Sequence, residues 1–416
     1  MDASKAGEGV FAGVDTHKEG HALCVLDALG RKVGEGSFPA DEAGYDALAR
    51  AIGEPSCCAS VGVEGAASYG AGLARRLLEL GYPVAEVLRP KRDRRRRGEG
   101  KSDPADAERA ARDAAAGKGT SAPKSQDGWV EAVRFLTAAR EIAVRTSTAC
   151  MNCAKGLVVT APEPVRAGLS GMGGAAMMAE LARERAGSGL VEDALFASLR
   201  ALALTWIEAK ERAAGLKDAI AALVRENAPA LLGMRGCGPV CAARLAIAAG
   251  DNPERLRSEA SFAALCGASP IEASSGKTVR HRLNRGGDRQ ANRALSDIAK
   301  SRMQHDERTM AYVARRTAEG KTKREIKRCL KRYIAREAYR ALRDPKAANG
   351  PDGTALREAR LSLGLTQAQA ASMLKVWNSQ ISRIERGAGG SPELAESYRS
   401  CLERLSAEAE GTEKET

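Results

Sequence analysis

Short apolar runs separated by turn residues fill the chain from Val10 to Glu64 and constrain its fold more than any other feature. The runs FAGVD, HALCVLDA, KVGEGSF and CASVGVE have the length and composition of β-strands, and a helix-like stretch precedes the last of them. A second helix-like stretch, a strand-like PVAEVL and a helix from about Pro104 follow. Three strands and then alternating helices and strands predict an α/β fold with a mixed sheet.

The composition limits what the rest of the chain does. Only 15 of the 416 residues are Phe, Tyr or Trp, so the core must be built from Ala, Leu, Val and Ile. An apolar share of 44% with 28% charged residues is typical of globular proteins and excludes a wholly disordered scaffold. The sequence has no apolar run of about 18 residues and no signal-peptide pattern, so we expect a cytoplasmic protein without a membrane partner. The ten cysteines have irregular spacings, which favour reduced thiols over a zinc or redox centre.

The positive charge is concentrated in two places. The net charge is +12, Lys91–Arg97 reads KRDRRRR and includes Arg94, Arg95 and Arg96, and residues 321–340 hold nine Lys or Arg against two Glu. A single patch is most simply a solvated helix face. Two patches in different parts of the chain favour a nucleic-acid partner, because basic side chains on phosphates release condensed counterions.

The periodicity divides the chain into five segments. An α/β segment (8–120) is followed by two long apolar-periodic helices (127–228), which predict an antiparallel arm for oligomerisation or, equally, ordinary packed helices. Basic helices occupy residues 229–342, and a linker rich in Pro, Gly and Asp spans 343–353. A compact set of short helices (354–406) completes an α/β plus all-α architecture.

Four carboxylates carry the strongest chemical signal. Asp15 and Glu64 each stand at the end of a predicted strand, and Asp103 and Asp106 lie three residues apart at the start of a helix, on one face. Each has a simpler explanation, such as a helix-dipole interaction for the aspartate pair. Together they match an RNase H-like nuclease, in which hard oxygen ligands hold Mg²⁺ or Mn²⁺ for phosphoryl transfer.

The segments GVDTHKEGHALCVLD, VGVEGAASYG and KSDPADAERAAR resemble those of the DEDD-type insertion-sequence transposases, the IS one-ten family, over residues 10–342. The resemblance implies a RuvC-like domain in which Asp15, Glu64, Asp103 and Asp106 bind the metal. It also implies donor and target DNA as substrates, a guide (bridge) RNA encoded by the element, and homodimers that assemble into tetramers.

A serine-containing segment, EASSGKTVRHRLNRGGDRQANRAL, resembles the second domain of that family. On its own, Ser-Ser-Gly is most often a turn. The resemblance implies that Ser275, with Ser274 as the rival, attacks DNA and forms a covalent phosphoserine link. Basic residues follow that suit the attacked phosphate: Lys277, Arg280, Arg282, Arg285, Arg289 and Arg293.

The last segment resembles a Cro/repressor-type helix-turn-helix. Its apolar spacing lets two short helices lock together, and the second helix would direct Asn378, Ser379, Gln380 and Arg383 to a major groove. Gln367, at the start of the first helix, is expected on a phosphate. A helical bundle for protein contact is the alternative, and Trp377 stands where a small polar residue is usual.

Three functions fit these patterns. The first is a DNA transposase or site-specific recombinase that uses the carboxylates and Ser275. The second is a RuvC-like structure-selective nuclease in which water attacks and leaves free ends. The third is a non-catalytic helix-turn-helix regulator, which the carboxylate set and the serine segment argue against.

Overall fold

A computed structural model describes residues 9–87, 103–272, 281–282, 284, 286–345, 353–385 and 392–412. These residues form two compact units. The first comprises the described residues up to Asp127 together with Gly250–Arg255, and the second comprises the remainder. Among the described residues, no helix combines the length and the apolar character that a membrane crossing requires.

The first unit is built on a six-stranded sheet with the order β3-β2-β1-β4-β5-β6. Strands β1 and β4 are parallel, as are β4 and β5, whereas β1–β2, β2–β3 and β5–β6 are antiparallel. The predicted mixed-sheet α/β fold is confirmed. The strands are β1 (Val10–Thr16), β2 (Gly20–Leu26), β3 (Lys32–Pro39), β4 (Cys58–Glu64), β5 (Val84–Val87) and β6 (Thr120–Ser121).

Helices cover both faces of this sheet. Helices α1 (Glu42–Ile52) and α2 (Ala71–Glu79) pack with β1 and β4 around a core of Leu, Val and Ala on one face. Helix α3 (Asp103–Ala115) lies on the other face, where its alanines pack against β1 and β2. Asp41 caps α1 by accepting a hydrogen bond from the Gly44 amide at 2.8 Å, and a short 3-10 turn (Pro55–Cys57) leads into β4.

Two glycines bring α3 unusually close to the sheet. A β-carbon on Gly13 would lie 2.0 Å from the Ala111 nitrogen, and one on Gly62 would lie 2.6 Å from the Ala110 oxygen. Neither position leaves room for any side chain. The helix matches them with alanines on its sheet-facing side, which are almost completely buried. This contact fixes the height and register of α3 over β1 and β4.

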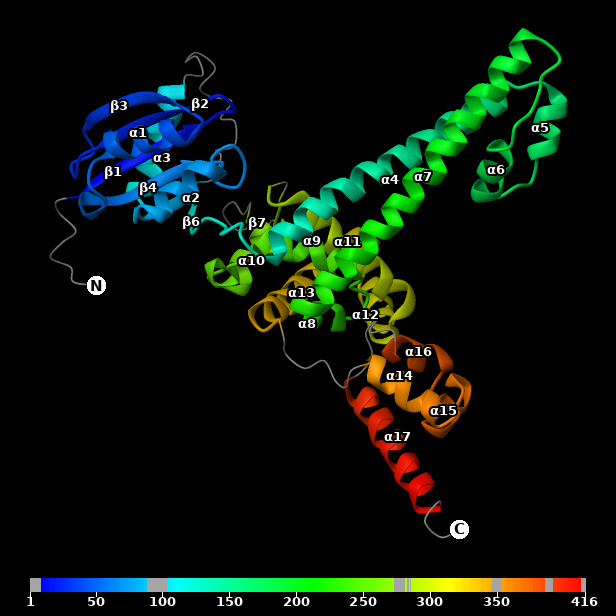
Figure 1. Ribbon diagram of the computed structural model, residues 1–416. Helices are drawn as coiled ribbons and strands as arrows, with labels where there is room; N and C mark the ends of the chain where they lie inside the picture. The colour runs from blue at the N-terminus through cyan, green and yellow to red at the C-terminus, as the bar shows by residue number, and fades with distance from the viewer. Residues whose placement is uncertain are drawn as a thin grey trace. The chain divides into compact units, whose positions relative to one another are not determined.

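The second unit begins with the two long helices that the periodicity predicts. Helices α4 (Trp129–Val159) and α7 (Leu190–Asn227) run side by side as an arm, with α5 (Glu163–Leu169) and α6 (Gly174–Leu181) at one end (Figure 1). The segment between the two long helices is therefore largely helical as well. Prolines begin α5, and the buried Val165, Leu169 and Met178 give these short helices a core of their own.

The largest core of the second unit lies between the base of the arm and the following helices. Two short strands, β7 (Ile271–Glu272) and β8 (His281–Arg282), pair antiparallel beside it. Arg244 of α9 donates to Glu141 of α4 at 3.0 Å and ties these helices together. The helices here are α8 (Pro229–Gly233), α9 (Pro239–Ala249), α10 (Glu259–Leu265), α11 (Arg289–His305), α12 (Glu307–Ala318) and α13 (Lys323–Arg343); a 3-10 turn (Pro253–Arg255) belongs to the first unit.

Four C-terminal helices form a separate small core. Residues including Leu356, Ile381, Ile384 and Tyr398 are buried in it. The turn between the second and third of these helices contains Lys375 in the left-handed region, with φ 54°. The helices are α14 (Gly353–Ser362), α15 (Gln367–Met373), α16 (Asn378–Glu385) and α17 (Pro392–Thr412).

Candidate active site and nucleic-acid interface

Two of the predicted carboxylates are neighbours at the edge of the sheet. Asp15 of β1 pairs in register with Glu64 of β4, and the side chains are only 3% and 6% exposed. Side chains alternate along a strand, so Asp15 points to the same face of the sheet as Gly13, and Glu64 to the same face as Gly62. That is the face covered by α3. The Thr16 hydroxyl donates to the Glu64 carbonyl at 2.7 Å and fixes the two strand ends together.

The first turn of α3 brings the other two carboxylates to this edge. Asp103 and Asp106 precede the alanines that lie on Gly13 and Gly62, so the close packing of α3 carries both acids towards the ends of β1 and β4. Asp103 is largely exposed, whereas Asp106 is half-buried. The four carboxylates predicted from sequence therefore come from three elements that converge at one edge.

His17 completes the cluster and was not among the predicted site residues. Its Nε2 atom lies 3.2 Å from Asp15 Oδ2 and 3.2 Å from Asp103 Oδ1. Potential ligand atoms of Asp15, His17 and Asp103 all lie within 4.8 Å of one another. The signal for His17 was present in the sequence, two residues after the strand-end aspartate.

Arg109 occupies the other half of the site. Its Nη2 atom lies 2.5 Å from Glu64 Oε2, and its Nη1 atom contacts the Asp106 carboxylate. One guanidinium group thus pairs with both carboxylates that lie outside the histidine cluster. Sequence reasoning missed this residue too, because it lies one turn beyond the acidic pair and reads as an ordinary helix-surface arginine.

The donor set suits a divalent cation of the Mg²⁺ type. Buried carboxylates on two adjacent strands, together with the more exposed carboxylates of a facing helix, offer the hard oxygen ligands that such ions prefer. The imidazole nitrogen of His17 adds a further donor atom beside them. The geometry therefore allows Asp15, Asp103 and His17 to hold one ion, with Glu64 and Asp106 available once Arg109 moves.

The predicted phosphate-binding residues have different placements. Arg289 and Arg293 are exposed on α11, and Arg293 lies 4.0 Å from Asp297. Of Arg282, the structure describes the backbone, in β8. The rest of the predicted phosphate-binding residues, from the arginine run and the serine-containing segment, lie outside the described residues together with the serine pair: Arg94, Arg95, Arg96, Ser274, Ser275, Lys277, Arg280 and Arg285.

In the C-terminal helices, α16 presents Asn378 and Ser379 to solvent, while Gln380 and Arg383 are half-buried. The Gln380 carboxamide oxygen accepts from the Trp377 amide at 3.0 Å, and the Trp377 side chain is 78% exposed. Gln367, expected on a phosphate, donates from its amide to Glu385 at 2.7 Å.

Glu385 anchors this group of helices. Its carboxylate accepts from Arg360 Nε at 2.6 Å and from the Tyr398 hydroxyl at 2.7 Å, and both charged groups are buried. Burial alone would raise the pKa of Glu385, but the hydrogen bonds from Arg360, Tyr398 and Gln367 hold it below its ordinary value. The pair therefore orients α16 against α14 and α17.

Carboxylates gathered over the ends of adjacent parallel strands are typical of enzymes that transfer phosphoryl groups with divalent metal ions. Known families agree. Residues 12–160 match the family model of the DEDD transposase of IS110 elements, and residues 228–314 match that described as "Transposase IS116/IS110/IS902 family". Residues 356–399 match a helix-turn-helix family. The chain belongs to the IS110 family of transposases and is a DNA transposase or recombinase with a DNA-binding helix-turn-helix. A comparison with curated proteins finds no match.

Proposed function

We propose that this transposase cuts and rejoins DNA strands with a metal-bound carboxylate set and a serine nucleophile. The observation that carries the proposal is the pairing of two buried carboxylates, Asp15 and Glu64, directly beneath the first turn of α3. Burying two acids next to each other is costly unless cations compensate them, and Arg109 compensates Glu64 alone of the two. A site with that cost is typical of function and not of stability.

The chain's own residues have distinct tasks in this account. Asp15 and Asp103 hold Mg²⁺ or Mn²⁺ with help from His17, and Glu64 and Asp106 extend the ligand set. A bound divalent ion polarises the scissile phosphate and neutralises the charge that develops on it. Arg109, released from Glu64 and Asp106, is near enough to offer its guanidinium group to the same phosphate.

Ser275 is the proposed nucleophile. Its hydroxyl oxygen forms a bond to phosphorus while the bond from phosphorus to the leaving deoxyribose oxygen breaks. The serine proton passes through solvent to the leaving oxygen. The phosphoserine link keeps the energy of the phosphodiester for rejoining, so no nucleotide cofactor is needed. The basic residues between Lys277 and Arg293, by their charge, favour the same phosphate.

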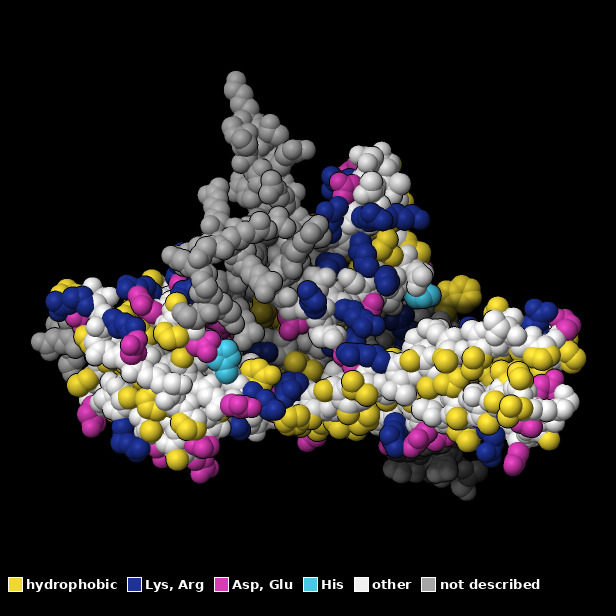
Figure 2. All heavy atoms as spheres, turned by 90° about the horizontal axis from the view of Figure 1, so that it is seen from above, with side chains coloured by type: hydrophobic (Ala, Val, Ile, Leu, Met, Phe, Trp, Pro, Cys, Tyr) yellow, Lys and Arg dark blue, Asp and Glu magenta, His cyan; other side chains and the backbone are white. Residues whose placement is uncertain are grey.

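The partners follow from the family and from the surface. We propose donor and target DNA as substrates, a guide RNA as the source of sequence choice, and action in the prokaryotic cytoplasm or nucleoid. The arm of residues 127–228 is the proposed oligomerisation segment, through which dimers pair into tetramers. Its exposed side chains include Phe135 and Ile142, each 59% exposed, and hydrophobic side chains are frequent on its surface in Figure 2.

For the helix-turn-helix we propose recognition of the element's own end or promoter through Asn378, Ser379 and Arg383. Ending the chain after residue 345 would then remove the footprint at that DNA. An unchanged footprint would show that the C-terminal helices serve another purpose.

A covalent-adduct assay tests the central proposal. Full-length protein is incubated with Mn²⁺, RNA transcribed from the element's non-coding flanks and end-labelled DNA from the same flanks, and then denatured. Wild type should retain label on the protein, Ser275→Ala should lose it, Ser274→Ala should keep it, and Asp15→Asn should abolish cleavage. Free DNA ends without any protein adduct in the wild type would contradict the serine mechanism and favour attack by water.

A further inference from the structure

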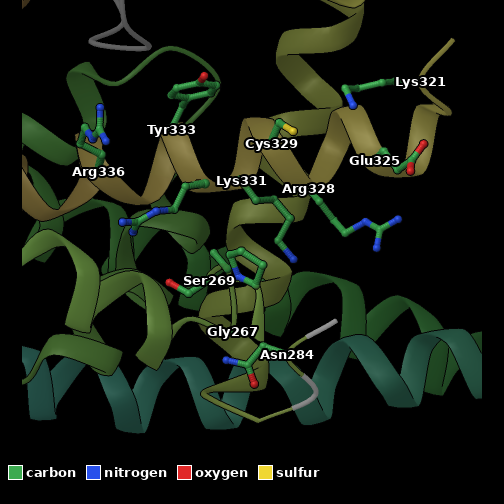
Figure 3. Close-up of a pocket in the computed structure, with 13 residues that line it drawn as sticks. Gly267, Ser269, Asn284, Lys321, Glu325, Arg328, Cys329, Lys331, Tyr333 and Arg336 are labelled. Atoms are coloured by element: carbon green, nitrogen blue, oxygen red, sulfur yellow. The ribbon is translucent and has the colours of Figure 1, made fainter. Parts of the chain in front are cut away.

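A basic pocket of about 550 Å³ lies between α13 and the loop that follows α10. Gly267, Ser269 and Asn284 form one wall, and the side chains of α13 form the other (Figure 3). The family match ends at residue 314, so it covers the loop wall and not α13. The helix that supplies most of the pocket's chemistry therefore lies beyond the matched region.

The pocket has a strong excess of positive charge. Five lining residues are cationic: Lys321, Arg328, Lys331, Arg332 and Arg336. Arg328, Arg332 and Arg336 repeat at four-residue intervals and so form a row along one side of α13. Among the described lining residues Glu325 is the one acid, and its carboxylate accepts hydrogen bonds from Thr322, at 2.7 Å from the hydroxyl. Arg336 pairs with Glu259 at 2.9 Å and Arg332 donates to the Glu259 carbonyl at 3.2 Å, whereas Arg328 has no carboxylate partner among the described residues. The row can therefore offer an anion more than one contact, with Arg328 the cation most available to it.

Lys331 is held in position at the pocket's floor. Its ammonium group donates to Asn292 Oδ1 at 2.6 Å, and the Asn292 amide donates to the Cys266 carbonyl at 2.7 Å and to the Gly267 carbonyl at 3.2 Å. Burial, with repulsion from Lys327, lowers the pKa of Lys331. In the part of the chain that the structure describes, no carboxylate pairs with Lys331; a half-buried lysine in that position is costly, and an anion in the pocket would lower the cost.

An aromatic side chain stands among these cations. Tyr333 lines the pocket and is 53% exposed. In the sequence it follows Arg332 and precedes Arg336. On its other side it meets Tyr312 edge-on, with ring centroids 6.2 Å apart. Exposed aromatic rings next to cations are the feature by which proteins bind unpaired bases, since every base has a face that stacks.

We propose that this pocket binds a nucleotide of single-stranded DNA, with its phosphates on the row of cations and its base on Tyr333. The proposal deepens the function proposed above, on which it rests, by naming where an unpaired strand is held. A pocket of this volume admits a nucleotide but is far smaller than a duplex. Strand exchange produces unpaired nucleotides, so a recombinase has a use for such a site.

Photo-crosslinking tests this binding without relying on catalysis. The probe is an oligodeoxythymidine of about 15 nucleotides carrying one 5-iodouracil, used with the full-length protein. We expect the crosslink on the peptide that contains Tyr333. Arg328→Ala should lower its yield at least about fivefold, because Arg328 is exposed and its loss leaves the core intact. Tyr333→Ala should weaken oligonucleotide binding by a similar factor.

Lys323→Ala is the matched control. Lys323 is exposed on α13 and does not line the pocket, and its substitution removes one positive charge, as Arg328→Ala does. Its crosslink yield should stay within about twofold of wild type. An equal loss in Lys323→Ala and Arg328→Ala would reduce the effect to general electrostatics and overturn the proposal, as would crosslinks that avoid Tyr333. A crosslink at Tyr333 by the matching oligouridine alone would assign the pocket to RNA.

Ser275→Ala separates this inference from the proposed function. Loss of the covalent adduct with an unchanged Tyr333 crosslink supports both. An adduct that persists in Ser275→Ala, with the crosslink in place, contradicts the nucleophile and keeps the pocket. A wild-type adduct without the Tyr333 crosslink rejects the pocket and keeps the nucleophile.

Discussion

At the scale of single residues, Gly13 decides whether the carboxylates meet. A methyl group there would lie 2.0 Å from the Ala111 nitrogen and 2.3 Å from the Ala107 oxygen, so α3 would have to move off the sheet. We expect Gly13→Ala to lower the free energy of unfolding of the first unit by about 3 kcal/mol or more and to weaken Mn²⁺ binding. Urea denaturation and calorimetric Mn²⁺ titration measure the two effects.

Gly34→Ala is its control. Gly34 lies in β3 of the same sheet, where an added β-carbon would meet Val25 at an ordinary contact distance of 3.5 Å. The free energy of unfolding of that variant should be close to that of the wild type. Equal losses in the two variants would show that the cost comes from glycine's strand position in general and not from the approach of α3.

Arg109 gives a second prediction at this scale. Its guanidinium group pairs with Glu64 and Asp106, two of the four carboxylates, and so competes with a cation for them. Arg109→Ala should raise Mn²⁺ affinity about tenfold, because a nearby positive charge is removed. Arg112→Ala, which breaks a pair with Glu108 on the exposed side of α3, should leave affinity unchanged. A weaker Mn²⁺ affinity in Arg109→Ala would show that the arginine positions the ligands instead.

Residue patterns predicted the four acids but not the histidine and arginine that contact them. Strand ends and helical spacing are local features, and they are sufficient to single out Asp15, Glu64, Asp103 and Asp106. The contacts of His17 with Asp103 and of Arg109 with Glu64 join segments far apart in the chain. They depend on how closely α3 sits on Gly13 and Gly62, which no single segment encodes.

At the scale of elements, α16 depends on the buried Arg360–Glu385 pair. The pKa of Glu385 is held below its ordinary value of 4.5, so the pair stabilises the fold above that pH and the stability is lost as pH falls through the lowered value. Hydrogen-exchange protection factors of α16 should therefore fall on acidification below 4.5. Glu385→Gln should lower the free energy of unfolding of the C-terminal helices by about 3–5 kcal/mol at neutral pH. The protection factors of α16 in this variant should depend less on pH.

Glu358→Gln is the control for this prediction, because Glu358 is exposed on α14. It should leave the protection factors of α16 and their dependence on pH unchanged. An acid profile of Glu385→Gln that matches the wild type would mean that another group titrates with the opening of α16.

The arm formed by α4 and α7 provides the other prediction for an element. Phe135 and Ile142 are exposed on α4. They are seven residues, or about two turns, apart and so lie on the same face of the helix. If the arm is an interface, Phe135→Asp with Ile142→Asp should convert dimers into monomers in sedimentation at micromolar protein. Thr148→Asp adds a charge at an exposed residue on a different face of the same helix and should not. Unchanged assembly in the double variant would exclude this face of the arm.

Periodicity predicted long elements better than short ones. The two arm helices extend over about the residues that their apolar spacing indicates, because burial repeats over many turns. Helices α5 and α6 and strand β6 escaped prediction. The two helices have only about two turns each, and the strand has two residues. Tertiary packing, such as that of Leu169 and Met178, stabilises such short helices more than local propensity does.

At the scale of the whole molecule, three kinds of chemistry share one chain. The first unit gathers carboxylates, the second presents basic helices and the pocket along α13, and the C-terminal helices present a recognition helix. Sequence patterns predicted the carboxylates, the basic helices and the helix-turn-helix, because each has its own periodicity and charge, but not the pocket along α13. They do not reveal how the parts cooperate on DNA, since that depends on interactions between segments that bind the same substrate.

The most direct test of the account is recombination in cells. The gene with its flanking non-coding DNA is paired with donor and target plasmids, and new junctions are counted for wild type, Ser275→Ala, Ser274→Ala and Asp15→Asn at equal protein levels. The account predicts junctions with wild type and Ser274→Ala, and none with Ser275→Ala or Asp15→Asn. Normal recombination by Ser275→Ala would contradict it.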